Sequence, residues 1–108
     1  MVADTTTAQR VDIELESLRL MLLDLPEFAA DWERLADGER TSWCLDWDQL
    51  MGALQIVLCP AHRSGVLSPD QQLRYHAVCR QLQQAMPTIR KLNLRPAPGP
   101  LIDEEAAP

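Results

Sequence analysis

Hydrophobic residues recur along the first quarter of the chain at alternating spacings of four and three. This spacing places one apolar stripe along an α-helix that begins at about residue 9. The stripe consists of Val11, Leu15, Leu18, Leu22 and Leu25. Because proline cannot donate a backbone hydrogen bond, we expect this helix to break near Asp24 and a second helix to start with Pro26 in its first turn. Gly38 should close that second helix.

A third helix is predicted from its N-cap and from a proline stop. It should start at Thr41 or Ser42, whose hydroxyls are good caps, and end before Pro60, because the residue before a proline is pushed out of the helical region. Its expected apolar stripe is Trp43, Trp47, Leu50, Leu54 and Val57.

The fourth helix has the clearest start in the chain. Ser68 is the expected N-cap, Pro69 occupies the first helical position, and Gln71 stands where a capping box needs it. A bend is expected at Pro87. The expected stripe is Tyr75, Val78, Leu82, Met86 and Ile89.

Both ends of the chain lack this periodicity. Residues 1–8 contain no apolar run, and residues 95–108 (RPAPGPLIDEEAAP) are rich in proline and end in acids, so we expect both segments to be disordered. Residues 9–94 should form a single helical domain. Since no stretch alternates like a strand and the connections are short, the sequence predicts an all-α fold, a small antiparallel bundle of about four helices.

Charge and cysteine content narrow the class of protein. The net charge of −6 combines −8 over residues 1–54, from twelve acids and four arginines, with +5 over residues 55–95 and −3 in the tail. The acidic and basic parts should pair within one chain or between two. Three cysteines are an odd number, which fits reduced thiols in the cytoplasm. No segment approaches the roughly 20 apolar residues that span a bilayer, so no membrane contact is expected.

Two mirrored segments, CPAH and HAVC, hold the residues most typical of a metal site: Cys59, His62, His76 and Cys79. Two cysteines and two histidines could ligate zinc at about 2.0–2.3 Å. If the third helix ends before Pro60, however, Cys79 lies roughly 15 Å along the fourth helix from the level of Cys59. The sequence therefore predicts no metal and no cofactor. A zinc-binding helical protein and a reactive cysteine–histidine pair are the alternatives.

Other patterns do not indicate an enzyme or a nucleic-acid binder. Asp46 and Asp48 point about 200° apart on a helix, so they cannot act together on one substrate. The basic residues of the fourth helix are spread around it, which is not typical of a nucleic-acid contact. The acidic first half could imitate a phosphate backbone, so an inhibitor or regulator of a nucleic-acid-acting partner is a further alternative.

Two groups of residues point to protein–protein contacts. Trp32, Trp43 and Trp47 gather in a short stretch. They could pack against the first helix or leave a ring at the surface as a binding anchor, since tryptophan is frequent among interface hot spots. The first helix also carries large apolar residues away from its stripe: Ile13, Leu20 and Leu23. A helix that is apolar on two sides needs two partners. We therefore expect a non-enzymatic interaction or regulatory accessory protein that binds a protein partner and forms a homodimer through its first helix, unless neighbouring helices cover both sides.

Overall fold

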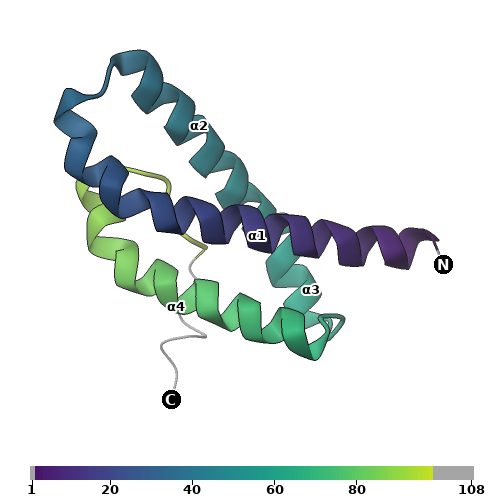
Figure 1. The fold of residues 1–108 in the computed structure, drawn as a ribbon. Helices are drawn as coiled ribbons and strands as arrows, with labels where there is room; N and C mark the ends of the chain where they lie inside the picture. Colours follow the sequence, from purple (N-terminus) through teal and green to yellow (C-terminus); the bar gives the residue numbers. More distant parts are fainter. Residues whose placement is uncertain (1, 99–108) are drawn as a thin grey trace.

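The computed structural model describes the backbone of residues 2–98 and the side chains of residues 7–98. Within that part of the chain the fold is all-α, without strands, so the predicted bundle of about four helices is confirmed (Figure 1). None of the described helices has the length and hydrophobicity to cross a bilayer. The elements in order are α1 (Val2–Asp31), the 3₁₀ turn η1 (Trp32–Arg34), α2 (Asp37–Ala53), the π-helical turn η2 (Leu54–Leu58), α3 (Cys59–Arg63) and α4 (Pro69–Lys91).

Helix α1 is the central element of the bundle. It packs against α4 on one side and against α2 and η2 on the other (Figure 1). Its predicted stripe is confirmed, because all five members are buried: Val11, Leu15, Leu18, Leu22 and Leu25. Burying each such side chain contributes about 1.5–3 kcal/mol, so this stripe is a main source of stability.

Helix α1 begins earlier than the sequence predicted. The helix starts at Val2, whereas disorder was expected over residues 1–8; Met1 lies outside the described residues. The carbonyl of Ala8 accepts a hydrogen bond from Gln71 Nε2 on α4 at 3.3 Å. Helix α4 therefore already contacts α1 at this level, and extending a helix from a docked segment costs little compared with nucleating one.

The predicted break near Asp24 is wrong, since α1 continues through Pro26 to Asp31. Pro26 is exposed, so water can reach the turn that lacks its hydrogen bond. Leu22 and Leu25 are buried directly before it, and Phe28 packs against α2 after it. Packing on both sides of the proline thus overrides a local helix breaker.

Helix α2 also begins earlier than predicted. It starts at Asp37, and Gly38 lies in its first turn instead of closing the preceding helix. The side chain of Glu39 reaches back and accepts a hydrogen bond from the Ala36 amide at 3.1 Å, which satisfies one of the unpaired amides at the helix start.

The predicted stop at Pro60 is wrong as well. Helix α2 passes through η2 directly into α3, and in η2 the amide of Cys59 bonds to the carbonyl of Leu54, five residues back. This wider turn stands immediately before Pro60. Prolines and π-helical turns are both common where a helix departs from regular α geometry. The buried residues of this helical path lie one position away from part of the predicted stripe: Trp47, Met51, Leu54 and Leu58 are buried, and Trp43, Leu50 and Val57 are half-buried.

The start of α4 is confirmed. The Gln71 amide donates to Ser68 Oγ at 3.1 Å, and the Ser68 amide donates to Gln71 Oε1 at 3.0 Å. Helix α4 continues through Pro87 to Lys91. Of the predicted stripe, Met86 is half-buried, and four residues are buried: Tyr75, Val78, Leu82 and Ile89.

Both α3 and α4 end in a left-handed turn of the same type. After α3, Gly65 has φ 72° and the Val66 amide bonds to the Ala61 carbonyl at 3.2 Å. After α4, Asn93 has φ 58° and the Leu94 amide bonds to the Ile89 carbonyl at 2.9 Å. These Schellman motifs satisfy carbonyls at the helix ends and reverse the chain direction.

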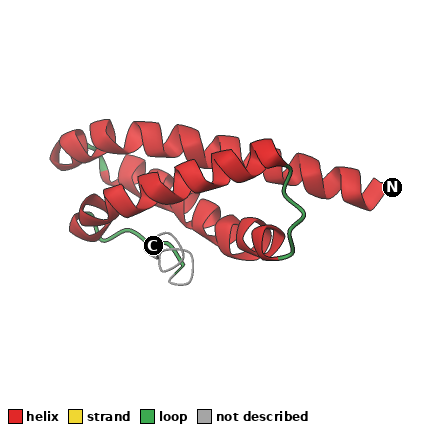
Figure 2. Ribbon diagram, turned by 90° about the horizontal axis from the view of Figure 1, so that it is seen from below, coloured by secondary structure: helices red, strands yellow, loops and turns green. Residues whose placement is uncertain are grey.

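The reversal after α4 sends residues 92–98 back along the bundle (Figure 2). Leu92, Leu94 and Ala97 are buried there. Trp47 Nε1 donates to the Arg95 carbonyl at 2.7 Å, and Arg95 Nη1 donates to the Asp48 carbonyl at 3.1 Å. The prediction of disorder from residue 95 onward is therefore wrong for residues 95–98, while residues 99–108 lie outside the described part of the chain.

Candidate protein-interaction surfaces

The outer face of α1, defined here by Ile13, Leu20 and Leu23, carries three large apolar side chains in contact with solvent. They are 60%, 47% and 56% exposed, respectively. The neighbouring helices cover the two flanks of α1 but leave this face open. The prediction that these residues point away from the core is confirmed. Coverage of these residues by a second chain stays a prediction.

One ion pair stands within this outer face. Arg19 donates to Glu16 through Nε at 2.8 Å and through Nη2 at 2.7 Å. The hydrogen bond lowers the pKa of Glu16 and raises the pKa of Arg19. Glu16 shares a helix face with Ile13 and Leu20, at spacings of three and four. Because the two charges satisfy one another, the face is locally neutral.

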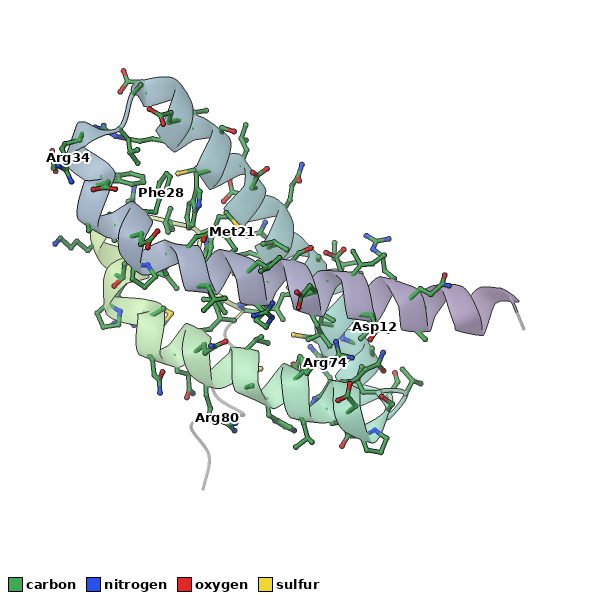
Figure 3. All side chains as sticks on the ribbon, viewed as in Figure 1. Asp12, Met21, Phe28, Arg34, Arg74 and Arg80 are labelled. Carbon is green, nitrogen blue, oxygen red and sulfur yellow. The ribbon has the colours of Figure 1, made fainter. Side chains whose placement is uncertain are left out.

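A polar contact fixes α1 against the start of α4. Asp12 Oδ1 accepts from Gln71 Nε2 at 2.9 Å and from Arg74 Nη2 at 2.7 Å (Figure 3). Arg74 also donates to Asp70 at 2.9 Å. The hydrogen bond from Gln71, followed by that from Arg74, lowers the pKa of Asp12. The acidic and basic parts of the chain therefore do meet, at this point, within one molecule.

The predicted tryptophan group lies together at the opposite end of the bundle. Trp43 stacks on Phe28 of α1, with ring centroids 4.5 Å apart, and on Trp47, at 5.6 Å. Trp47 is fully buried, so its prediction as an interface residue is wrong; it belongs to the core. Trp32 and Trp43 are half-buried, and the guanidinium of Arg40 lies 5.6 Å from the centre of the Trp32 ring.

A groove runs between α1 on one side and α2, η2 and α3 on the other. Four hollows of about 440, 670, 400 and 240 Å³ follow one another along it, and each shares lining residues with the next. Figure 3 shows Met21 and Phe28 on the side of α1 that faces α2. We call this feature the α1–α2 groove; its apolar lining includes Met21, Phe28, Trp43, Leu50, Ala53, Ile56 and Val57. It was not predicted, because these residues flank the two buried stripes and have no periodicity of their own.

The charges along the groove have mostly one sign. Among the described residues, one base lines it, Arg10, and that base is paired with Glu14 at 2.9 Å. The carboxylates that line it are Glu14, Asp24, Glu27, Asp31, Glu39 and Asp46. Asp31 pairs with Arg34 at the end of the molecule. The groove therefore has an apolar floor and acidic borders.

The mirrored cysteine and histidine segments meet in part. Tyr75 Oη donates to Cys59 Sγ at 3.6 Å, His62 stacks on Tyr75 with ring centroids 4.6 Å apart, and the centroids of His62 and His76 are 5.4 Å apart. Cys59 was expected level with the start of α4, but it lies beside Tyr75, because the helix continues past Pro60.

This cluster does not have the geometry of a metal centre. Within residues 7–98, no group of three or more histidine, cysteine, aspartate or glutamate side chains is placed to hold a metal ion. Cys59 and Cys79 are buried, and the third cysteine, Cys44, is half-buried. Burial, and then the charge of Asp48, raises the pKa of Cys44, so its thiol is protonated at neutral pH and is a poor nucleophile.

Comparison with known proteins adds no information about function. No family model, no curated protein and no solved structure matches the chain. Proposals about function therefore rest on the surfaces described above.

Proposed function

We propose that this chain is a small non-enzymatic interaction protein that forms a homodimer through the outer face of α1 and acts as an accessory subunit of a protein partner. The observation that carries the proposal is the exposure of Ile13, Leu20 and Leu23 on a helix whose two flanks are already occupied. A symmetric contact would cover this face on both copies at once.

The expected strength of this contact is modest. Each of the three side chains is already about half covered, so each gains roughly 1 kcal/mol when it is fully buried. The dimer should therefore be weak, and one charged substitution, which acts on both copies, should prevent it.

The test compares the sedimentation of Leu20→Glu and Leu23→Glu with that of the wild type. Both variants should be folded monomers, with melting temperatures near that of the isolated wild-type monomer, because the charge replaces a solvent-exposed side chain. Leu73→Glu is the matched control, since Leu73 is a leucine of α4 that is 72% exposed. It should leave the association unchanged.

Two outcomes would contradict the proposal. If Leu73→Glu disrupts association as strongly as Leu20→Glu, the outer face of α1 is not the contact. If Leu20→Glu and Leu23→Glu unfold the protein, these side chains stabilise the monomer instead of an interface.

A further inference from the structure

We infer that the α1–α2 groove binds an amphipathic helix of a partner protein whose apolar stripe is bordered by arginine or lysine. This inference rests on the proposed function as an interaction protein and specifies the chemistry of the partner. It uses a different side of α1 from the proposed dimer contact, so the two can fail independently.

The shape of the groove fits a helix. Arg10 of α1 lines the same hollow as Ile56, and Phe28 lines the same hollows as Trp43, so α1 and α2 run antiparallel along it. The 17 residues of α2 extend about 25 Å at 1.5 Å per residue. A partner helix of four to five turns matches this length, and an apolar groove between two helices is a common site for an amphipathic helix.

The floor of the groove supplies apolar contacts along its length. Leu50 and Val57 are half-buried beside Met21, so each still presents apolar surface. Ile56 is 75% exposed at the end of the groove near α3. Large apolar side chains spaced along one groove are what the i, i+3, i+4 and i+7 positions of a partner helix would contact.

The charges along the borders select a basic helix. Among the described residues, Asp24, Glu27, Glu39 and Asp46 form no ion pair, and the guanidinium of Arg10 is already bonded to Glu14. An acidic helix would bring like charges together, whereas arginine or lysine beside the apolar stripe would face these carboxylates.

The aromatic end of the groove is suited to the same side chains. Trp43 and Phe28 line two hollows together with carboxylates of both helices. The alkyl stem of lysine or arginine packs on apolar surface while its charged end reaches a carboxylate. At this end of the molecule a basic side chain already packs on an aromatic ring: Arg40 lies over the Trp32 ring and donates to the Trp32 backbone carbonyl at 2.9 Å.

The probe is a synthetic peptide of about 18 residues made of leucine, alanine and lysine, with leucine on one helical stripe and lysine on its borders. One comparison peptide has glutamate in place of lysine, and another has the same composition without the stripe. Binding to the full chain is followed by the anisotropy of a fluorescent label on the peptide, at physiological salt. The striped lysine peptide should bind at least about tenfold more tightly than either comparison peptide.

Substitutions in the groove then locate the site. Ala53→Phe fills the groove without changing any charge and should weaken binding of the lysine peptide about tenfold. Ile56→Asp removes an exposed apolar contact and adds a negative charge. It should weaken binding if the apolar floor is needed, whereas a purely electrostatic attraction to the lysines would become stronger. Asp46→Asn should weaken binding a few-fold. Its matched control is Glu33→Gln, an exposed acid of η1 outside the groove lining, which should have no effect.

Several results would overturn the inference. These are absence of binding, equal binding of the glutamate or the unstriped peptide, stronger binding to Ile56→Asp, and equal effects of Asp46→Asn and Glu33→Gln. If Ala53→Phe or Ile56→Asp abolishes self-association, the groove is occupied by a second copy and not by a basic partner. Leu20→Glu should leave peptide binding unchanged. A wild-type chain that is monomeric but still binds the lysine peptide would contradict only the homodimer proposal.

Discussion

At the scale of single residues, a few polar side chains fix the register of a bundle that is otherwise held by apolar packing. Asp12 on α1 receives hydrogen bonds from Gln71 and Arg74, and the side chain of Gln71 also accepts from the Ser68 amide at the start of its own helix. One side chain thus specifies both where α4 begins and where it docks on α1. Apolar packing alone tolerates several arrangements, whereas hydrogen bonds with fixed geometry distinguish between them.

The contact at Asp12 should make part of the stability depend on pH. The folded-state pKa of Asp12 is lowered, so its contribution is fully present above the unfolded pKa of about 3.8 and is lost as the pH falls through the folded pKa. Wild type should be more stable than Asp12→Asn at pH 6, and this difference should shrink as the pH falls below about 4. Urea unfolding of both proteins at a series of pH values measures this difference in the free energy of unfolding. A difference that stays constant down to pH 3 would mean that the charge of Asp12 does not stabilise the fold.

Two glycines should respond to alanine in opposite directions. Gly65 has φ 72°, where alanine is strained, so Gly65→Ala should destabilise the protein by about 1–2 kcal/mol. Gly38 lies in the first turn of α2 with no atom within 4 Å of the position of a Cβ, so Gly38→Ala should stabilise it by about 0.4–1 kcal/mol. Thermal unfolding of the two variants checks both signs, and equal effects would show that the backbone conformation is not what distinguishes them.

At the scale of elements, packing decides where local signals conflict. The capping box at Ser68 and the stripe from Val11 to Leu25 could be predicted from the sequence, because a cap and a periodic stripe act within one helix. The breaks expected at Pro26 and Pro60 are absent, because each proline lies in a helix whose neighbouring turns are buried against other helices. The exposed side of α1 could likewise be predicted from a helical projection of its sequence. The groove could not, since its lining depends on how two helices pack.

The segment after α4 should stabilise the bundle although it has no regular structure. A chain that ends at Leu94 lacks the Arg95 carbonyl to which the Trp47 indole donates a hydrogen bond. It also lacks the side-chain contacts of Arg95 and the buried Ala97. Leaving a buried donor without a partner costs about 1–3 kcal/mol, so this chain should be less stable by about that amount than a chain that ends at Pro98.

Trp47→Phe provides the control for this comparison. It removes the indole N–H, so the same truncation should cost less in the variant than in the wild type. Urea unfolding of the four proteins gives the coupling energy. Equal stability of the two wild-type lengths would mean that residues 95–98 do not contribute to the fold.

At the scale of the whole molecule, the arrangement leaves the central helix incompletely covered. Helix α1 has α4 on one flank and α2 on the other, with residues 92–98 closing the bundle near Trp47. Its outer face and the groove beside α2 remain open to solvent. A chain of this size could bury the whole of α1 only with another element, and the proposed homodimer provides one from a second copy.

The homodimer is tested most directly by sedimentation equilibrium of the wild-type chain up to about 1 mM, because a contact of this modest size should be weak. We predict that the weight-average mass rises with concentration from that of one chain toward that of two, and that Leu20→Glu, still folded by circular dichroism, has the mass of one chain throughout. A wild-type protein that has the mass of one chain at every concentration would contradict the proposal and leave the outer face of α1 open in solution.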